Sequence, residues 1–124
     1  MDPRMKEELL LTLTGVFAWV ASADEGANAQ EYQKFTHAIL ESPFASQYSE
    51  TDLDHAYKDM VDLFLKDFDL AMNLTLERMD DFSEDPLIKT EILRLARAAV
   101  VGDGKIHQSE ENALTIIKKQ LALK

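Results

Sequence analysis

Residues 98–110 read AAVVGDGKIHQSE, and this stretch decides the fold predicted for the chain. Small apolar residues lead into a Gly-Asp-Gly turn, one further apolar residue, Ile106, follows, and Glu110 opens the next segment. Glycine commonly ends a helix because it adopts the left-handed backbone conformation without a steric penalty. The stretch therefore predicts two helices joined by a tight acidic corner.

A similar corner occurs earlier in the chain, where residues 21–31 read ASADEGANAQE. In both corners an Asp stands at the end of the first helix, and a Glu follows seven residues later. The four residues are Asp24 and Glu31 in the first corner and Asp103 and Glu110 in the second. Two such corners in 124 residues predict an internal pseudo-repeat of helix–turn–helix units.

Helical patterning extends over the rest of the chain, and no strand pattern competes with it. Asp2-Pro3 and Asp85-Pro86 each offer an N-cap carboxylate followed by a proline at the first helical position. The helix predicted from Asp2 to about Ala23 is apolar on several faces, which is typical of a helix surrounded by others. We expect residues 1–124 to form a single all-α domain, a compact bundle of five to seven helices.

The longest periodic pattern begins at Thr51, which is the predicted N-cap, and runs to Asp80. A straight helix of this length would measure ~40 Å at 1.5 Å per residue, too long for so small a domain. We therefore expect a bend or break between Asp67 and Asn73. The apolar residues of this pattern are predicted to be core, including Leu65 and Phe68, and Leu87 is predicted to be buried on the helix after Pro86.

The formal net charge is −10, and it is concentrated in one part of the chain. Residues 50–85 hold twelve acidic and three basic residues. Such a field repels nucleic acid and anionic membrane surfaces but attracts cations or a basic protein partner. The alternative is a solvated helix face that keeps the protein in solution.

Several functional classes are excluded or disfavoured by composition. The chain has no Cys, and no nucleophile–base pair, phosphate-binding glycine loop or zinc motif is present, so we do not expect an enzyme. The apolar run at residues 9–23 resembles a signal peptide but lacks a basic leader, and it is too short to span a bilayer. We predict a cytoplasmic protein without membrane insertion.

The second corner matches the back half of a calcium EF-hand loop, from Asp103 to Glu110. The front half is missing, because Ala99 and Val101 stand where the first ligands would be. A divalent cation such as calcium, magnesium, manganese or zinc would need both corners to pool their four carboxylates. His107 is a weaker candidate ligand. The alternative is structural: Glu31 and Glu110 have the spacing of capping-box glutamates, so the corners would only join helices.

The second corner and its helices resemble the TerB family of tellurite-resistance proteins. Three segments carry the resemblance: Ile92-Leu93-x-Leu95-Ala96, Asp103-Gly104-x-Ile106-x-x-x-Glu110 and Leu114-x-x-Ile117. The first corner is similar to the family's N-terminal acidic corner, but Glu25 replaces the expected Gly, which is displaced to Gly26, and Ala27 replaces a larger apolar residue.

This resemblance implies an all-helical, non-enzymatic module with a pseudo-repeat and an acidic cluster that binds a divalent metal ion. Carried over residue by residue, the cluster would be Asp24, Glu31, Asp103 and Glu110. The implied setting is a cytoplasmic complex linked to tellurite and other chemical stress. The alternative function is a protein–protein interaction domain whose acidic corners are purely structural.

Overall fold

The computed structural model of the chain describes residues 2–22, 29–100 and 108–122. Within these ranges all regular structure is helical, which confirms the predicted all-α bundle. The helices are α1 (Pro3–Ser22), α2 (Ala29–Leu40), the short 3-10 helix η1 (Ala45–Gln47), α3 (Glu50–Lys66), α4 (Phe68–Asp80), α5 (Pro86–Ala98) and α6 (Gln108–Ala122). None of the described helices is both long and apolar enough to cross a membrane.

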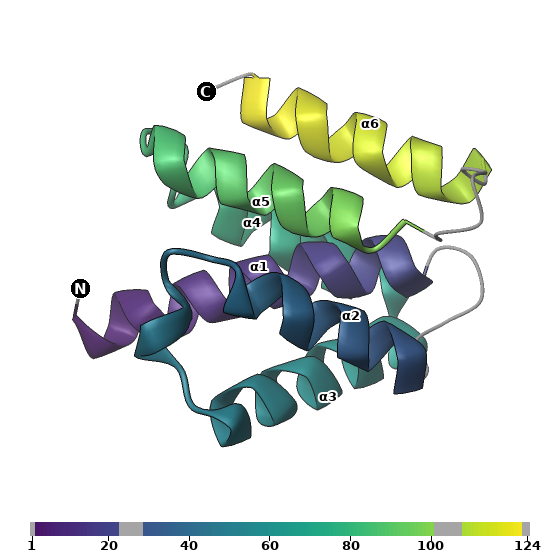
Figure 1. Cartoon of the computed structure of the whole chain (residues 1–124). Coiled ribbons are helices and arrows are strands. Elements are labelled where there is room, and N and C mark those ends of the chain that lie inside the picture. Colours follow the sequence, from purple (N-terminus) through teal and green to yellow (C-terminus); the bar gives the residue numbers. More distant parts are fainter. Residues whose placement is uncertain (1, 23–28, 101–107, 123–124) are drawn as a thin grey trace.

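Helix α1 is the central element of the bundle (Figure 1), and α2, α3, α4, α5 and α6 all contact it. Its side chains Leu9, Leu13, Val16 and Phe17 are fully buried. This arrangement confirms the prediction that the first helix is surrounded by others. Burying most of α1 from Leu9 to Ala21 removes a large apolar area from water, which is the main favourable contribution to folding.

Two helices begin as their sequences predict. The Asp2 carboxylate accepts a hydrogen bond of 2.8 Å from the Met5 backbone N–H. The Asp85 carboxylate accepts bonds of 3.1 Å from the N–H groups of Leu87 and Ile88. Each cap satisfies backbone donors that have no partner within the first helical turn.

The third helix begins two residues earlier than predicted, because Ser49 and not Thr51 is its N-cap. The Ser49 hydroxyl accepts a bond from the Asp52 N–H, and the Asp52 carboxylate accepts one from the Ser49 N–H. This reciprocal pair is a capping box, which Thr51 cannot form with the same partner. The expected break is confirmed at Asp67, which ends α3 and caps α4.

Three apolar residues predicted to be buried are exposed. Leu65 is 69% exposed, Leu87 53% and Phe68 36%. Leu65 and Phe68 flank the break at Asp67, so the periodicity of one continuous helix does not apply to them. Leu87 lies in the first turn of α5, where the inward-facing residue is instead Ile88.

Candidate functional site

The four predicted metal ligands are only partly within the described residues. Asp24 and Asp103 lie outside them, as does His107. Glu31 lies in the first turn of α2, with a side chain that is 14% exposed. Glu110 lies in the first turn of α6 and is 1% exposed, which makes it one of the most deeply buried charged residues described.

The helix ends that flank the two corners lie at the same end of the bundle (Figure 1). The C-terminal ends of α1 and α5 and the N-terminal ends of α2 and α6 all lie there. The sequence could not establish this arrangement, because the distance between the helix pair α1–α2 and the helix pair α5–α6 depends on the packing of the whole bundle. Convergence of the four carboxylates itself depends on residues 23–28 and 101–107, which are not described.

Lys34 links the beginning of α2 to the end of α5. Its ammonium lies 3.4 Å from a Glu31 carboxylate oxygen and donates a hydrogen bond of 3.1 Å to the Val100 backbone carbonyl. Val100 is three residues before Asp103 in the sequence. This contact connects the flanks of the two corners across 66 positions of the chain.

Aromatic side chains pack beside Glu31. The rings of Tyr32 and Tyr57 meet edge to face with centroids 5.0 Å apart, and Phe35 packs 5.1 Å from Tyr57. Burial raises the pKa of Tyr57, and the negative charge of Glu31 raises it further. The Tyr57 hydroxyl has no hydrogen-bond partner among the described residues. The sequence pattern assigns Tyr57 to the core and gives no indication of this polar atom near Glu31.

A partly buried ion pair on α5 was also missed by sequence reasoning. Glu91 is 5% exposed, and its carboxylate accepts hydrogen bonds of 2.8 Å and 3.0 Å from the Arg94 guanidinium. Arg94 also donates to the Ala38 carbonyl at 2.7 Å, which joins α5 to α2. These bonds from Arg94 lower the pKa of Glu91, so its carboxylate is ionised. Glu91 shares the inward face of α5 with Ile88 and Leu95, and this spacing was the available signal.

No three His, Asp or Glu side chains within residues 2–22, 29–100 and 108–122 are grouped closely enough to hold a metal ion. The predicted cluster takes two of its four members from outside these ranges, so it stays a prediction. Glu31 and Glu110 are the two described members that could contribute ligands.

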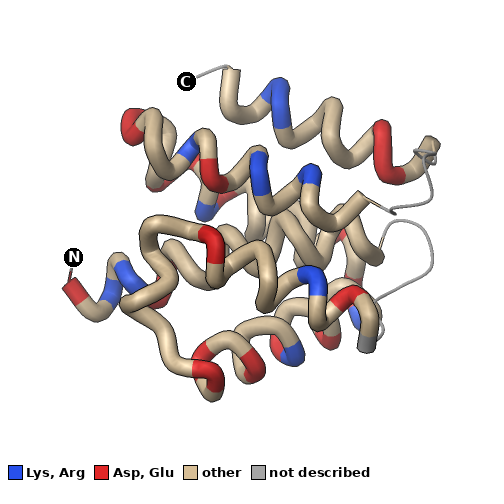
Figure 2. The backbone as a smooth tube through the Cα atoms, viewed as in Figure 1, with Lys and Arg blue, Asp and Glu red and all other residues tan. Residues whose placement is uncertain are grey.

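The predicted acidic face is partly neutralised by neighbouring lysines. Acidic residues recur along the length of α3, with lysines between them (Figure 2). Lys58 lies 3.0 Å from Asp54, and Lys66 lies 2.8 Å from Asp62. Exposed pairs of this kind stabilise a fold only slightly, but they reduce the charge that a partner would meet.

Comparisons of the chain with protein-family models, curated proteins and solved structures find no match.

Proposed function

We propose that this protein is a TerB-like, non-enzymatic module that binds a divalent metal ion through Asp24, Glu31, Asp103 and Glu110. We place it in the cytoplasmic response to tellurite or other chemical stress, on the strength of the family resemblance. The observation that supports the metal site best is the burial of Glu110, at 1% exposure, at the end of the bundle where both helix pairs turn.

The burial of Glu110 supports a metal site because it places carboxylate oxygens away from bulk water at this end of the bundle. Attraction between a carboxylate and a cation is stronger where water is excluded. Calcium takes six to eight oxygen ligands, and magnesium prefers six. Four carboxylates together with loop carbonyls and water would supply such a set, and the cation would offset the repulsion between them.

The alternative is an interaction domain in which the corners only join helices. The contact of Lys34 with Glu31 and with the Val100 carbonyl favours this alternative, because it supplies a positive charge without a metal. A capping role for Glu110 at the beginning of α6 would likewise need no cation. The two proposals differ in whether metal binding contributes to stability.

A series of thermal unfolding measurements distinguishes the metal-binding proposal from the interaction-domain proposal. The protein is melted in chelator and then with calcium, magnesium, manganese and zinc in turn. A metal at 100 times its dissociation constant adds about 2.7 kcal/mol to the free energy of unfolding, on the order of 10 °C for a domain of this size. No rise with any of the four metals contradicts the metal site.

A matched pair of variants assigns the effect to the corners. Asp103→Asn with Glu110→Gln removes two negative ligands, while Gln retains the ability to cap a helix. The control, Asp69→Asn with Glu111→Gln, makes the same change of charge at two exposed positions. We expect metal-dependent stabilisation to disappear in the first variant and to persist in the control. Persistence in both would contradict this assignment of the ligands.

A further inference from the structure

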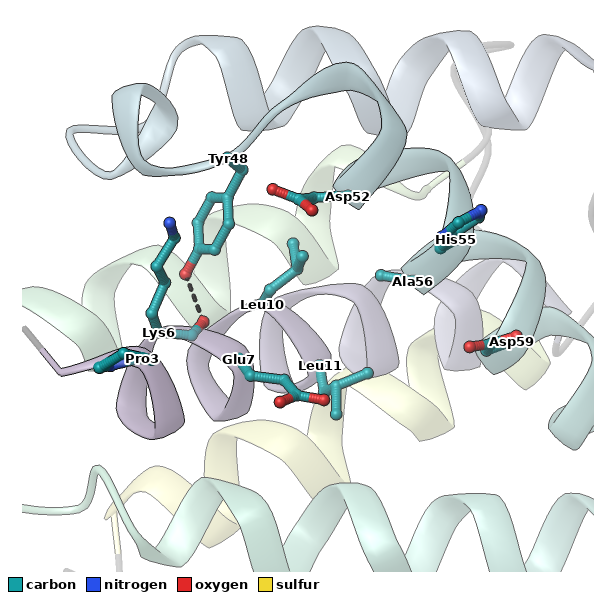
Figure 3. A pocket seen from close by; sticks show the side chains of 10 residues that line it. All are labelled: Pro3, Lys6, Glu7, Leu10, Leu11, Tyr48, Asp52, His55, Ala56 and Asp59. Atoms are coloured by element: carbon teal, nitrogen blue, oxygen red, sulfur yellow. Dashed lines mark hydrogen bonds between the residues drawn. The ribbon is translucent and has the colours of Figure 1, made fainter.

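An open groove of about 340 Å³ runs between α1 and α3 (Figure 3). Leu10, Leu11 and Ala56 form its apolar part. The charged side chains around it are Glu7 and Lys6 from α1 and Asp52 and Asp59 from α3, and His55 of α3 also lines it. We propose that this groove binds a basic polypeptide segment of a partner protein, with Glu7 and Asp59 pairing with its lysine or arginine side chains.

The apolar part of the groove suits the stems of such side chains. Leu10 and Ala56 are each 6% exposed and belong to the core, whereas Leu11 is half-buried and lies in the groove between Glu7 and Asp59 (Figure 3). Lysine and arginine pack their aliphatic stems on apolar surface while their charged ends remain in contact with water or carboxylates. A segment that alternates basic and apolar side chains would therefore contact both the groove and its rim.

The two carboxylates differ from their neighbours because they are available to a partner. Glu7 and Asp59 are exposed, and neither makes an ion pair with any described residue. Asp54 and Asp62 on the same helix are both paired with lysines. Glu7 and Asp59 come from different helices on either side of Leu11, so a bound segment would contact both walls of the groove.

Two further charged groups of the groove, Asp52 and Lys6, already have partners. Asp52 belongs to the capping box with Ser49, whose backbone N–H lowers the pKa of the Asp52 carboxyl. Asp52 is thus ionised and adds negative charge without being free to change partners. Lys6 lies 5.9 Å from the Tyr48 ring centroid, at the end of the groove opposite Asp59 (Figure 3). Three carboxylates against one lysine leave the groove negative.

A second hollow, near the beginning of α1, is lined by more carboxylates but is less suitable for the basic side chains of a partner. Asp2, Asp81, Glu84 and Asp85 line it. Asp2 and Asp85 cap α1 and α5, so their carboxylates already accept backbone hydrogen bonds. The N-terminal ends of both helices also carry partial positive charge, which opposes a bound cation. The groove between α1 and α3 is therefore the better docking site.

The test measures binding of a defined basic peptide by fluorescence anisotropy. The probe is a fluorescein-labelled twelve-residue peptide that repeats Lys-Leu-Arg-Ser three times, and chelator is present throughout, so the result does not depend on the proposed metal site. We expect Glu7→Lys with Asp59→Lys to raise the dissociation constant at least tenfold. The control, Asp69→Lys with Glu111→Lys, changes the net charge equally at exposed positions outside the groove, and we expect it to have less than a threefold effect.

The second measurement is the change in the backbone amide NMR shifts of the protein when the peptide without fluorescein is added. We expect the largest shifts at Leu11, Ala56 and Asp59, with circular dichroism showing that all variants keep their helices. Equal weakening in both variants, or shifts centred elsewhere, would show that only the overall charge attracts the peptide and would overturn the proposal. So would failure of the wild-type protein to bind the probe, or displacement of the probe by spermine as readily as by unlabelled peptide.

Discussion

The pKa values of Tyr48 and Tyr57 are both raised, but the two hydroxyl groups have different surroundings. The Tyr48 hydroxyl donates a hydrogen bond of 2.7 Å to the Lys6 carbonyl and so fastens the segment after η1 to α1. The Tyr57 hydroxyl lies in the aromatic core without a partner among the described residues. The same substitution should therefore affect stability differently at the two positions.

We expect Tyr48→Phe to lower the free energy of unfolding by about 1 kcal/mol, which is the usual net contribution of one hydrogen bond. Tyr57→Phe removes a buried polar group that makes no compensating bond, so stability should stay the same or rise by up to ~1 kcal/mol. Urea unfolding of both variants at pH 7 measures the difference. A larger loss in Tyr57→Phe than in Tyr48→Phe would contradict the assigned surroundings.

The raised pKa values also predict a loss of stability at alkaline pH. Burial raises the pKa of Tyr48 to about 12 and raises that of Tyr57 as well. An unfolded tyrosine loses its proton near pH 10, so above this pH the unfolded state is favoured while the folded state stays protonated. Below about pH 10 both states are protonated, and the two groups make no pH-dependent contribution.

The expected result is a free energy of unfolding that falls steadily from pH 10 to pH 11.5. The fall should be smaller in Tyr57→Phe and in Tyr48→Phe, because each variant removes one of the responsible groups. Urea unfolding at half-unit pH intervals measures the slope. An unchanged slope in both variants would mean that other groups cause the alkaline loss.

At the scale of helices, Gly15 lies where α1 packs closely against α4. A methyl group added there would lie 2.8 Å from the Thr75 hydroxyl oxygen and 3.2 Å from its methyl carbon. Thr75 is fully buried, and its hydroxyl donates to the Ala71 carbonyl, so the side chain has little freedom to move away. The lack of a side chain at Gly15 is what lets the two helices pack at this distance.

Gly15→Ala should therefore destabilise the protein by about 1 kcal/mol, although alanine is the better helix former. Overpacking costs ~1–3 kcal/mol, and the gain in helix propensity is about 1 kcal/mol. Adding Thr75→Ala to Gly15→Ala should recover stability relative to the sum of the single changes, since the clashing atoms are then absent. Thermal unfolding of the two single variants and the double variant measures this coupling. Additive effects would count against the close contact.

The extent to which the sequence predicted these helices depended on whether the signal was local. Asp2-Pro3 and Asp85-Pro86 fix helix beginnings through neighbouring atoms, and both predictions were confirmed. The beginning of α3 was placed wrongly because Ser49 and Thr51 are both good caps, and the choice depends on the reciprocal bond from Asp52. That signal, a serine three residues before an acid, was present in the sequence.

The candidate site was less predictable because it combines distant segments. The seven-residue spacing marked Glu31 and Glu110 as the acids that begin the second helix of each pair, and both do lie in a first turn. The Lys34 contact with Val100 and the position of Tyr57 beside Glu31 depend on how α2, α3 and α5 pack. Helical periodicity contains no information about such contacts between helices.

At the scale of the whole molecule, the net charge of −10 sets a background that acts on both stability and binding. Like charges on a compact domain repel one another more than in the expanded unfolded chain. The described surface ion pairs, such as Lys66 with Asp62, offset this only in part, because exposed pairs contribute ~0–1 kcal/mol each. Folding should therefore become more favourable when the charges are screened.

We expect the melting temperature in chelator to rise when sodium chloride is increased from 10 to 300 mM. The screening length falls from about 30 Å to below 8 Å over this range, so repulsion across the domain is lost while direct ion pairs weaken only slightly. Asp69→Lys with Glu111→Lys changes the net charge from −10 to −6, because each reversal adds two positive charges, and its melting temperature should rise less with salt. An equal or steeper rise in this variant would mean that salt acts through something other than self-repulsion. The same variant is the control for peptide binding, so one protein separates the general field from the specific contribution of Glu7 and Asp59.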